Sequence, residues 1–205
     1  MLNIVVFVSG RGSNLKSILN SIENREMNAE ILAVVSDNID CPAFQIAQKH
    51  KIPTFTVGNE KKDGIISYSQ LINNLKDLKI GLIVLAGFLK KIPEELIDSF
   101  QNRIINIHPA LLPAFGGKGM YGINVHRAVF EKSCKVSGAT VHFVDKIYDN
   151  GKIIAQRCVE IEDVKTPEQI AEKVLSVEHQ ILPFVIRKFS EGKIVISEPR
   201  VRILE

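Results

Sequence analysis

Two polar residues with catalytic potential, Asn106 and His108, stand at the end of an apolar stretch that reads RIINIHPALLP from Arg103 to Pro113. Side chains at positions i and i+2 of a strand point to the same side. An amide and an imidazole are therefore expected to face one spot, at the strand end where open α/β sheets bind ligands. A satisfied amide beside a surface histidine is the simpler interpretation of the spacing alone.

A glycine-rich segment follows this pair and favours a ligand-binding interpretation. Residues 115–124 read FGGKGMYGIN, with four glycines in ten residues. Glycine-rich loops after strands often approach ligands closely. Pro109 and Pro113 bracket the turn between the strand and this loop and stiffen it.

A second glycine-rich turn, Ser9–Asn14 (SGRGSN), lies between a predicted strand at Ile4–Val8 and a predicted helix from Leu15. This arrangement offers backbone N–H groups and the positive end of a helix dipole to a phosphate. The spacing matches neither the dinucleotide fingerprint nor the P-loop, so a single phosphate fits better than a pyrophosphate. A plain turn in which Ser13 or Asn14 caps the helix stays open as the alternative.

Strands and helices alternate through the first half of the chain, which predicts an α/β fold with a doubly wound, mostly parallel sheet and right-handed crossovers. The predicted strands are Ile4–Val8, Ile31–Val35, Pro53–Val57, Ile80–Leu85 and Arg103–Ile107, and the helices between them begin near Leu15, Pro42, Ile66 and Pro93.

The second half predicts a β-hairpin and a long helix. The segment DKIYDNG, residues 145–151, is expected to be a tight turn between strands at Thr140–Val144 and Lys152–Glu160. A helix is predicted from Thr166 to about Ser190, followed by a last short strand at Ile194–Ile196. No repeat or linker interrupts the chain, which predicts one domain over residues 1–205.

Composition narrows the class of protein. The 205 residues are 45% hydrophobic and 24% charged, with a net charge of +3 from 26 basic and 23 acidic side chains. Scattered basic residues and a small net charge argue against a nucleic-acid partner, and no apolar run has membrane-spanning length. No signal sequence precedes the first strand, so we expect a cytoplasmic enzyme or binding protein. We expect the protein to be a monomer or a weak homodimer.

The three cysteines, Cys41, Cys134 and Cys158, show neither CxxC spacing nor a cluster with histidine. A zinc site and a disulfide framework are therefore not expected. Inert packing cysteines are the simpler interpretation.

The sequence NIHPALLP, followed by the glycine-rich loop and by HRAV at residues 126–129, resembles the formyltransferases that use 10-formyltetrahydrofolate. The resemblance extends from Ile4 to about Gly192 and is strongest with the branch that formylates glycinamide ribonucleotide. It implies a formyltransferase fold and transfer of a formyl group from 10-formyltetrahydrofolate, as cosubstrate, to the amine of 5′-phosphoribosylglycinamide in purine synthesis, without a metal.

Formyl transfer proceeds through a tetrahedral oxyanion and needs proton transfer at two nitrogens. The resemblance implies that Asn106 donates to the oxyanion, and that His108 shares this task or acts as an acid. It also implies that Asp149 pairs with His108 and organises a proton-carrying water. From the residues alone Asp149 is a turn aspartate. His142 is expected to support the site, with a core histidine as the alternative.

The resemblance also implies two sets of binding residues. Those for the ribonucleotide are Gly12, Ser13, Asn14, Leu175, Ser176, Val177 and Glu178. Those for the folate are Leu89, Lys90, Lys91, Ile92, Asn106, Asp145, Lys146, Ile147, Tyr148 and Asp149.

Two positions depart from the family pattern. Lys90 stands where arginine is common, and a lysine is a single-point cation rather than a planar fork. Gly64 stands where some members carry a substrate-binding arginine, a contact that Lys61 or Lys62 would have to supply here.

Other functions use the same kind of fold. A formyltetrahydrofolate deformylase would carry an added N-terminal domain and a methionyl-tRNA formyltransferase a C-terminal barrel, and neither is expected in this chain. A non-catalytic nucleotide- or sugar-phosphate-binding module is compatible with the fold. The joint presence of Asn106, His108 and Asp149 favours an enzyme.

Overall fold

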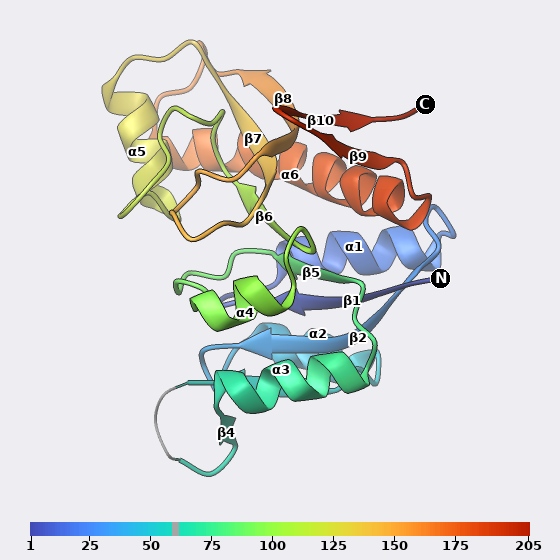
Figure 1. Ribbon diagram of the computed structural model, residues 1–205. Helices are drawn as coiled ribbons and strands as arrows, with labels where there is room; N and C mark the ends of the chain where they lie inside the picture. Colours follow the sequence, from blue (N-terminus) through green and yellow to red (C-terminus); the bar gives the residue numbers. More distant parts are fainter. Residues whose placement is uncertain (59–61) are drawn as a thin grey trace. The chain divides into compact units, whose positions relative to one another are not determined.

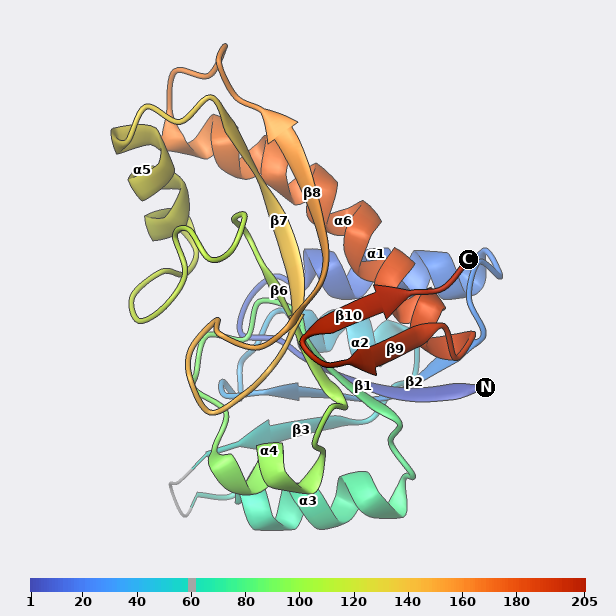
Figure 2. The ribbon, with the colours of Figure 1, turned by 45° about the horizontal axis from the view of Figure 1, so that its top comes forward.

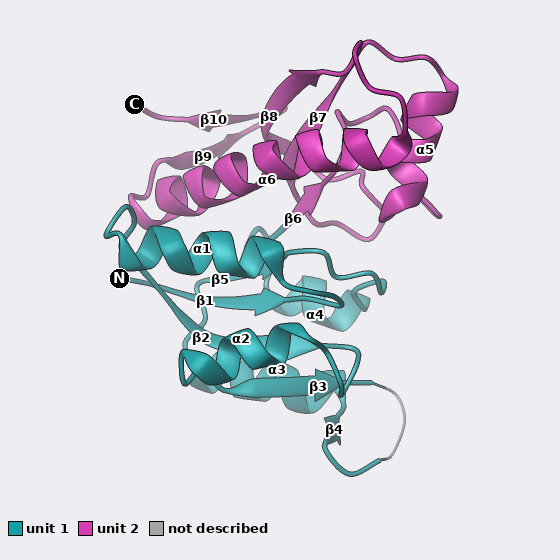
Figure 3. Ribbon diagram, turned by 180° about the vertical axis from the view of Figure 1, so that it is seen from behind, with its two compact units in different colours: residues 1–105 teal, residues 106–205 magenta. Residues whose placement is uncertain are grey.

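The structure is a computed structural model that describes residues 1–58 and 62–205. The chain divides into two compact units, residues 1–105 and 106–205 (Figure 3). It passes from the first to the second within strand β6 (Ile104–His108). The single domain predicted for residues 1–205 stays a prediction.

Unit 1 contains a parallel sheet whose strands follow the order β4-β3-β2-β1-β5. The strands are β1 (Leu2–Phe7), β2 (Ala29–Ser36), β3 (Thr54–Val57), β4 (Ile65–Ile66) and β5 (Leu82–Leu85). Residues 4–8 and 82–84 are completely buried. Their continuous apolar runs reflect a sheet that is covered on both faces, as the sequence indicates.

Helices cover both faces of this sheet, which confirms the doubly wound arrangement. Helices α1 (Ser13–Glu23) and α2 (Ala43–Lys49) lie on one face, and α3 (Tyr68–Asp77) and α4 (Glu94–Ser99) lie on the other (Figures 1 and 3). The apolar positions of α1 and α3 recur at helical spacing and are buried, so these helices form because they shield the sheet from water.

Unit 2 is built on an antiparallel pair of strands and a long helix. Strands β7 (Val136–Phe143) and β8 (Ile153–Glu160) pair antiparallel. Helix α6 (Pro167–Ser190) packs along both strands and contacts α5 (Ile123–Glu131) (Figure 2). Strands β9 (Ile194–Ser197) and β10 (Arg200–Ile203) form a separate antiparallel hairpin.

The structure corrects three details of the predicted elements. Ile66 belongs to strand β4 rather than to a helix, because a Ser67–Gln70 capping box starts α3 at Tyr68. Residues 144–152 form a loop between β7 and β8 rather than a tight turn. The strand at Ile194 is not the last one, because β10 follows and pairs with it.

The backbone explains the longer loop. A Cβ atom added to Gly151 would lie 1.8 Å from the carbonyl oxygen of Phe143, so Gly151 serves a close backbone approach rather than a two-residue turn. Within the loop, Asp149 has a left-handed conformation, with φ +52°.

The structure bears differently on the predictions about membrane spans, cysteines and the lysines near Gly64. In the described part of the chain, no helix is long and apolar enough to cross a membrane. Cys41 is buried, but Cys158 is exposed on β8, so the packing interpretation is wrong for Cys158. Lys61 lies outside the described residues, and Lys62 is exposed.

Candidate active site

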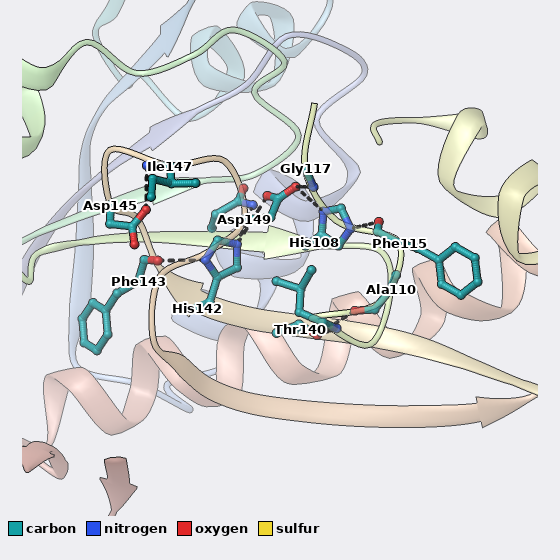
Figure 4. Close-up of polar contacts among 12 residues, drawn as sticks. His108, Ala110, Phe115, Gly117, Thr140, His142, Phe143, Asp145, Ile147 and Asp149 are labelled. Atoms are coloured by element: carbon teal, nitrogen blue, oxygen red, sulfur yellow. Dashed lines mark hydrogen bonds and ion pairs between the residues drawn. The ribbon is translucent and has the colours of Figure 1, made fainter. Parts of the chain in front are cut away.

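The candidate active site in unit 2 is centred on the carboxylate of Asp149, which lies between two buried histidines (Figure 4). Its Oδ2 atom is 3.6 Å from Nδ1 of His108, and its Oδ1 atom is 3.7 Å from Nε2 of His142. Oδ2 also accepts a 2.8 Å hydrogen bond from the backbone N–H of Gly117. Strands β6 and β7 and the 144–152 loop thus deliver their polar side chains to one place.

The contacts of His108 assign its two ring nitrogens. Nε2 is 2.8 Å from the carbonyl oxygen of Phe115. A carbonyl can only accept, so Nε2 carries a proton in this arrangement. Nδ1 is too far from Asp149 for a direct hydrogen bond. It is therefore the nitrogen with room to exchange a proton with a bound group.

His142 orients Asn106. Nδ1 of His142 is 2.8 Å from the carbonyl oxygen of Phe143 and donates to it. Nε2 of His142 then accepts from Nδ2 of Asn106, 3.1 Å away. Burial lowers the pKa of His142, although the Phe143 carbonyl and the charge of Asp149 oppose this. A neutral His142 can act as this acceptor, and one N–H of Asn106 is left to face a substrate.

The glycine-rich loop contributes backbone rather than side chains. A Cβ atom on Gly116 would lie 2.5 Å from Cδ2 of Leu112 and 3.2 Å from Cβ of Asp149. The loop can therefore pack against Asp149 only where it has no side chain. Its carbonyl at Phe115 and its N–H at Gly117 consequently reach His108 and Asp149.

Thr140 is a supporting residue that the sequence reasoning missed. Its Oγ1 donates to the carbonyl of Ala110 at 2.6 Å and accepts from the N–H of Leu112 at 3.1 Å. Nε2 of Gln156 contacts both Thr140 Oγ1 and the carbonyl of Leu112. These bonds fix the turn after His108. The available signal was its i, i+2 spacing to His142 on β7.

The predicted phosphate-binding turn lies in unit 1. Gly12 stands at the start of α1 with φ +73°. Its missing Cβ would lie 2.8 Å from the Cβ of Ala43. Within residues 1–58 and 62–205, no side chain caps α1, so the alternative of a Ser13 or Asn14 cap is wrong. Ser13 is exposed and Asn14 is buried.

The predicted ribonucleotide residues of unit 2 lie on α6. Val177 and Glu178 are buried, Leu175 is half-buried and Ser176 is exposed. Glu178 is the one charged side chain among these four residues, and it is 9% exposed.

The predicted folate residues fall into two segments. Leu89, Lys90 and Lys91 in unit 1 are exposed, whereas Ile92 is buried. In the 144–152 loop, Asp145 accepts from the N–H of Ile147 at 2.8 Å and from Nδ2 of Asn150 at 3.1 Å.

Two large apolar side chains of the 144–152 loop are exposed, Ile147 at 64% and Tyr148 at 44%.

Across residues 1–58 and 62–205, no three His, Cys, Asp or Glu side chains have the arrangement of a metal site. The metal-free reaction stays a prediction.

Comparison with known protein families shows which family the chain belongs to. The formyl transferase family matches residues 2–186, and the chain belongs to this family. Among its relatives, the phosphoribosylglycinamide formyltransferase of Bacillus subtilis is 34% identical over 189 residues, which cover 92% of this chain and 94% of the relative. The chloroplastic phosphoribosylglycinamide formyltransferase of Arabidopsis thaliana is 40% identical over 205 residues, covering 98% of this chain and 70% of the relative.

Solved structures agree with the relatives. The phosphoribosylglycinamide formyltransferase of Anaplasma phagocytophilum has a TM-score of 0.89 and 31% identity, and the match covers 100% of this chain and 94% of that one. A formyltetrahydrofolate deformylase from Pseudomonas syringae has a TM-score of 0.87 but 22% identity, over 100% of this chain and 67% of that one. The second likeness shows a shared fold alone.

His126 predicts a pH dependence of stability. It is 5% exposed on α5, and burial, followed by the nearby charge of His108, lowers its pKa from 6.5 to about 4. The unfolded chain therefore binds a proton below about pH 6.5 that the folded protein does not bind until about pH 4. Protons consequently favour unfolding in this window. The loss from His126 approaches about 3 kcal/mol at pH 4.

Urea denaturation between pH 7 and pH 4 measures this loss. We expect His126→Gln to have a flatter pH profile than the wild type, because the glutamine does not titrate. The wild-type loss of stability between pH 6.5 and pH 4 should exceed the loss in the variant. Parallel profiles would contradict the assignment.

Proposed function

We propose that this protein transfers a formyl group from 10-formyltetrahydrofolate to the amine of 5′-phosphoribosylglycinamide, giving N-formylglycinamide ribonucleotide and tetrahydrofolate. The observation that carries the proposal is the meeting of Asn106, His108 and Asp149 around one point in a formyl transferase fold. The relatives in Bacillus subtilis and Arabidopsis thaliana, which are named for this reaction, support the substrate.

The reaction begins when the neutral amine attacks the formyl carbon and its oxygen becomes an oxyanion. The free N–H of Asn106, held by His142, is a preorganised donor for that oxygen. His108 is the second group that can donate to the oxyanion, through Nδ1. Because both residues are anchored before substrate arrives, little reorganisation is needed as the charge develops.

Two protons must then move. The attacking nitrogen loses one, and N10 of the folate gains one as its bond to the formyl carbon breaks. In this proposal Asp149 accepts the first proton, directly or through a water, and passes it to N10, and until then its charge stabilises His108. No covalent bond to the protein is required, and the products leave the side chains in their starting protonation states.

The remaining predicted residues bind the two substrates in this proposal. Gly12, Ser13 and Asn14 hold the phosphate at the start of α1, and Glu178 with Leu175, Ser176 and Val177 contacts the ribose and glycinamide. Exposed Leu89, Lys90 and Lys91, the backbone at Ile92, and residues 145–149 line the folate.

The decisive measurement is turnover of 10-formyltetrahydrofolate by the full chain, with and without glycinamide ribonucleotide. We expect tetrahydrofolate to form at a useful rate only when the ribonucleotide is present, because its amine is the acceptor. Mass spectrometry should find the added formyl group on the ribonucleotide.

The other outcomes each name a different function. Equal turnover without the ribonucleotide would indicate a hydrolase and would contradict the proposal. Binding of the ribonucleotide without any turnover would indicate a binding module, and would contradict it as well.

A further inference from the structure

A single serine ties three strand ends of unit 1 together. Ser9 follows β1, and its N–H donates to the carbonyl of Gly87 at 3.0 Å. Its Oγ donates to Oδ1 of Asp37, just after β2, at 2.6 Å. The N–H of Leu89, after β5, donates to the same Oγ at 3.0 Å. These contacts form a clip, defined here as Ser9, Asp37 and the backbone N–H of Leu89.

The chemistry of the clip fixes the direction of each bond. A serine hydroxyl has one proton to donate and lone pairs to accept with. The hydroxyl donates its hydrogen bond to the Asp37 carboxylate, and the 2.6 Å distance is typical of an O–H donor bound to a charged acceptor. The lone pairs of Oγ are then directed to the Leu89 N–H. Because the hydroxyl hydrogen of Ser9 is directed to Asp37, its Oγ acts as the acceptor for the N–H of Leu89.

The segment that the clip holds has buried anchors at its ends and an exposed middle. Phe88 is buried and packs edge-on against Phe7, with ring centroids 5.3 Å apart, and Ile92 is 4% exposed. Leu89 is 49% exposed, and Lys90 and Lys91 are exposed. The Ser9 hydroxyl supplies a polar anchor for the backbone where the exposed part begins.

We infer that Ser9 and Asp37 are positioning residues for the folate substrate. They fix the backbone that carries the side chains of Leu89, Lys90 and Lys91, which contact the folate. The inference rests on the proposed function, in which this segment lines the folate. Neither residue touches the substrate in this role. Ser9 acts through the Leu89 N–H, and Asp37 acts through Ser9.

The first test needs no activity. Amide hydrogen exchange at Leu89 is measured by NMR in the ligand-free full chain, for the wild type, Ser9→Ala and Asp37→Ala. Losing one hydrogen bond is expected to speed exchange at Leu89 by about three- to tenfold in Ser9→Ala. A smaller acceleration is expected in Asp37→Ala, where the hydroxyl remains but loses its fixed direction.

The second test separates positioning from general damage. We expect both variants to raise KM for 10-formyltetrahydrofolate by about three- to tenfold, with KM for the ribonucleotide and kcat changed less than about twofold. The double variant should be no worse than Ser9→Ala alone, because Asp37 acts through Ser9. An unchanged KM for the ribonucleotide checks that Ser9→Ala does not act through the phosphate-binding turn, of which Ser9 is the first residue.

Ser21→Ala is the matched control. Ser21 is a buried serine of α1 whose Oγ donates to Oε2 of Glu26 at 2.7 Å, which is the same kind of bond in a different segment. We expect this variant to leave Leu89 exchange and the folate KM at wild-type values.

Three results would overturn the inference, and they are distinguishable. Unchanged exchange at Leu89 in Ser9→Ala would show that the clip does not hold the backbone. Faster exchange with an unchanged folate KM would remove the role toward folate. Wild-type protein that does not bind 10-formyltetrahydrofolate would overturn the proposed function itself, whatever the exchange at Leu89.

Discussion

Replacing His108 with alanine is expected to lower kcat for formyl transfer by roughly a hundred- to a thousandfold. The variant removes the ring whose Nδ1 lies 3.6 Å from Oδ2 of Asp149. It thereby removes the proposed second donor to the oxyanion and the proposed partner of Asp149 in proton transfer. Because His108 is 3% exposed and anchored by Phe115, water does not readily replace it. Single-turnover kinetics with both substrates bound measures this effect.

His50→Ala is the matched control for His108→Ala. His50 lies after α2 in unit 1 and pairs with Glu23 at 3.1 Å on the surface. We expect its removal to leave kcat at the wild-type value, since an exposed ion pair contributes little. A His108→Ala enzyme within about tenfold of the wild type would contradict the role given to His108.

Asp149→Ala tests whether His108 and Asp149 act as a pair. If Asp149 works by supporting His108 and carrying its proton, the double variant should be much less impaired than the product of the two single losses. Fully multiplicative losses would show that the two side chains act in separate steps.

A large loss of stability is expected from Gly138→Ala. A Cβ atom at this position on β7 would lie 2.1 Å from the carbonyl oxygen of Arg157 and 2.9 Å from the Cα of Cys158. Both neighbours belong to the backbone of β8, so relief requires the paired strands to separate. We expect a loss of about 3 kcal/mol in the free energy of unfolding, measured by urea denaturation.

Gly10→Ala gives the comparison for Gly138→Ala. Apart from Gly10 itself and its two chain neighbours, no atom of the described residues lies within 4 Å of the Cβ that this substitution would add, and Gly10 does not have a left-handed φ. We expect no loss of stability there. An equal loss in the two variants would mean that the effect at Gly138 is not caused by crowding between β7 and β8.

Much of the fold could be predicted because burial leaves a mark on sequence. The uninterrupted apolar runs at Ile4–Val8 and Ile80–Leu85 indicated strands covered on both faces, and the structure confirms this. The predictions failed where local signals competed. Ile66 has an apolar helical pattern, but the Ser67 cap places the helix start after it. Asn150-Gly151 has hairpin composition, yet Gly151 serves a close contact with Phe143.

The candidate site shows the same division. The i, i+2 spacing of Asn106 and His108 predicted one shared spot. In the structure Asn106 contacts His142, and His108 lies 3.6 Å from Asp149. The roles of these residues and of the substrate-binding segments stay predictions. Thr140 and the backbone groups of Phe115 and Gly117 escaped notice, because a hydrogen bond made by a carbonyl or an N–H depends on no particular side chain.

The sequence by itself therefore determined the alternation of strands and helices, the polar pair at the end of β6 and the family resemblance. Each follows from local periodicity or from side-chain type. Only the tertiary structure decided that Asp149 lies between His108 and His142, that His142 orients Asn106, and that Ser9 joins Asp37 to Leu89. Apart from Asp149 and His142, which are 7 positions apart, those relations link residues 28 to 80 positions apart. No periodic pattern records a contact across such a separation, because it is set by how the strands and loops pack.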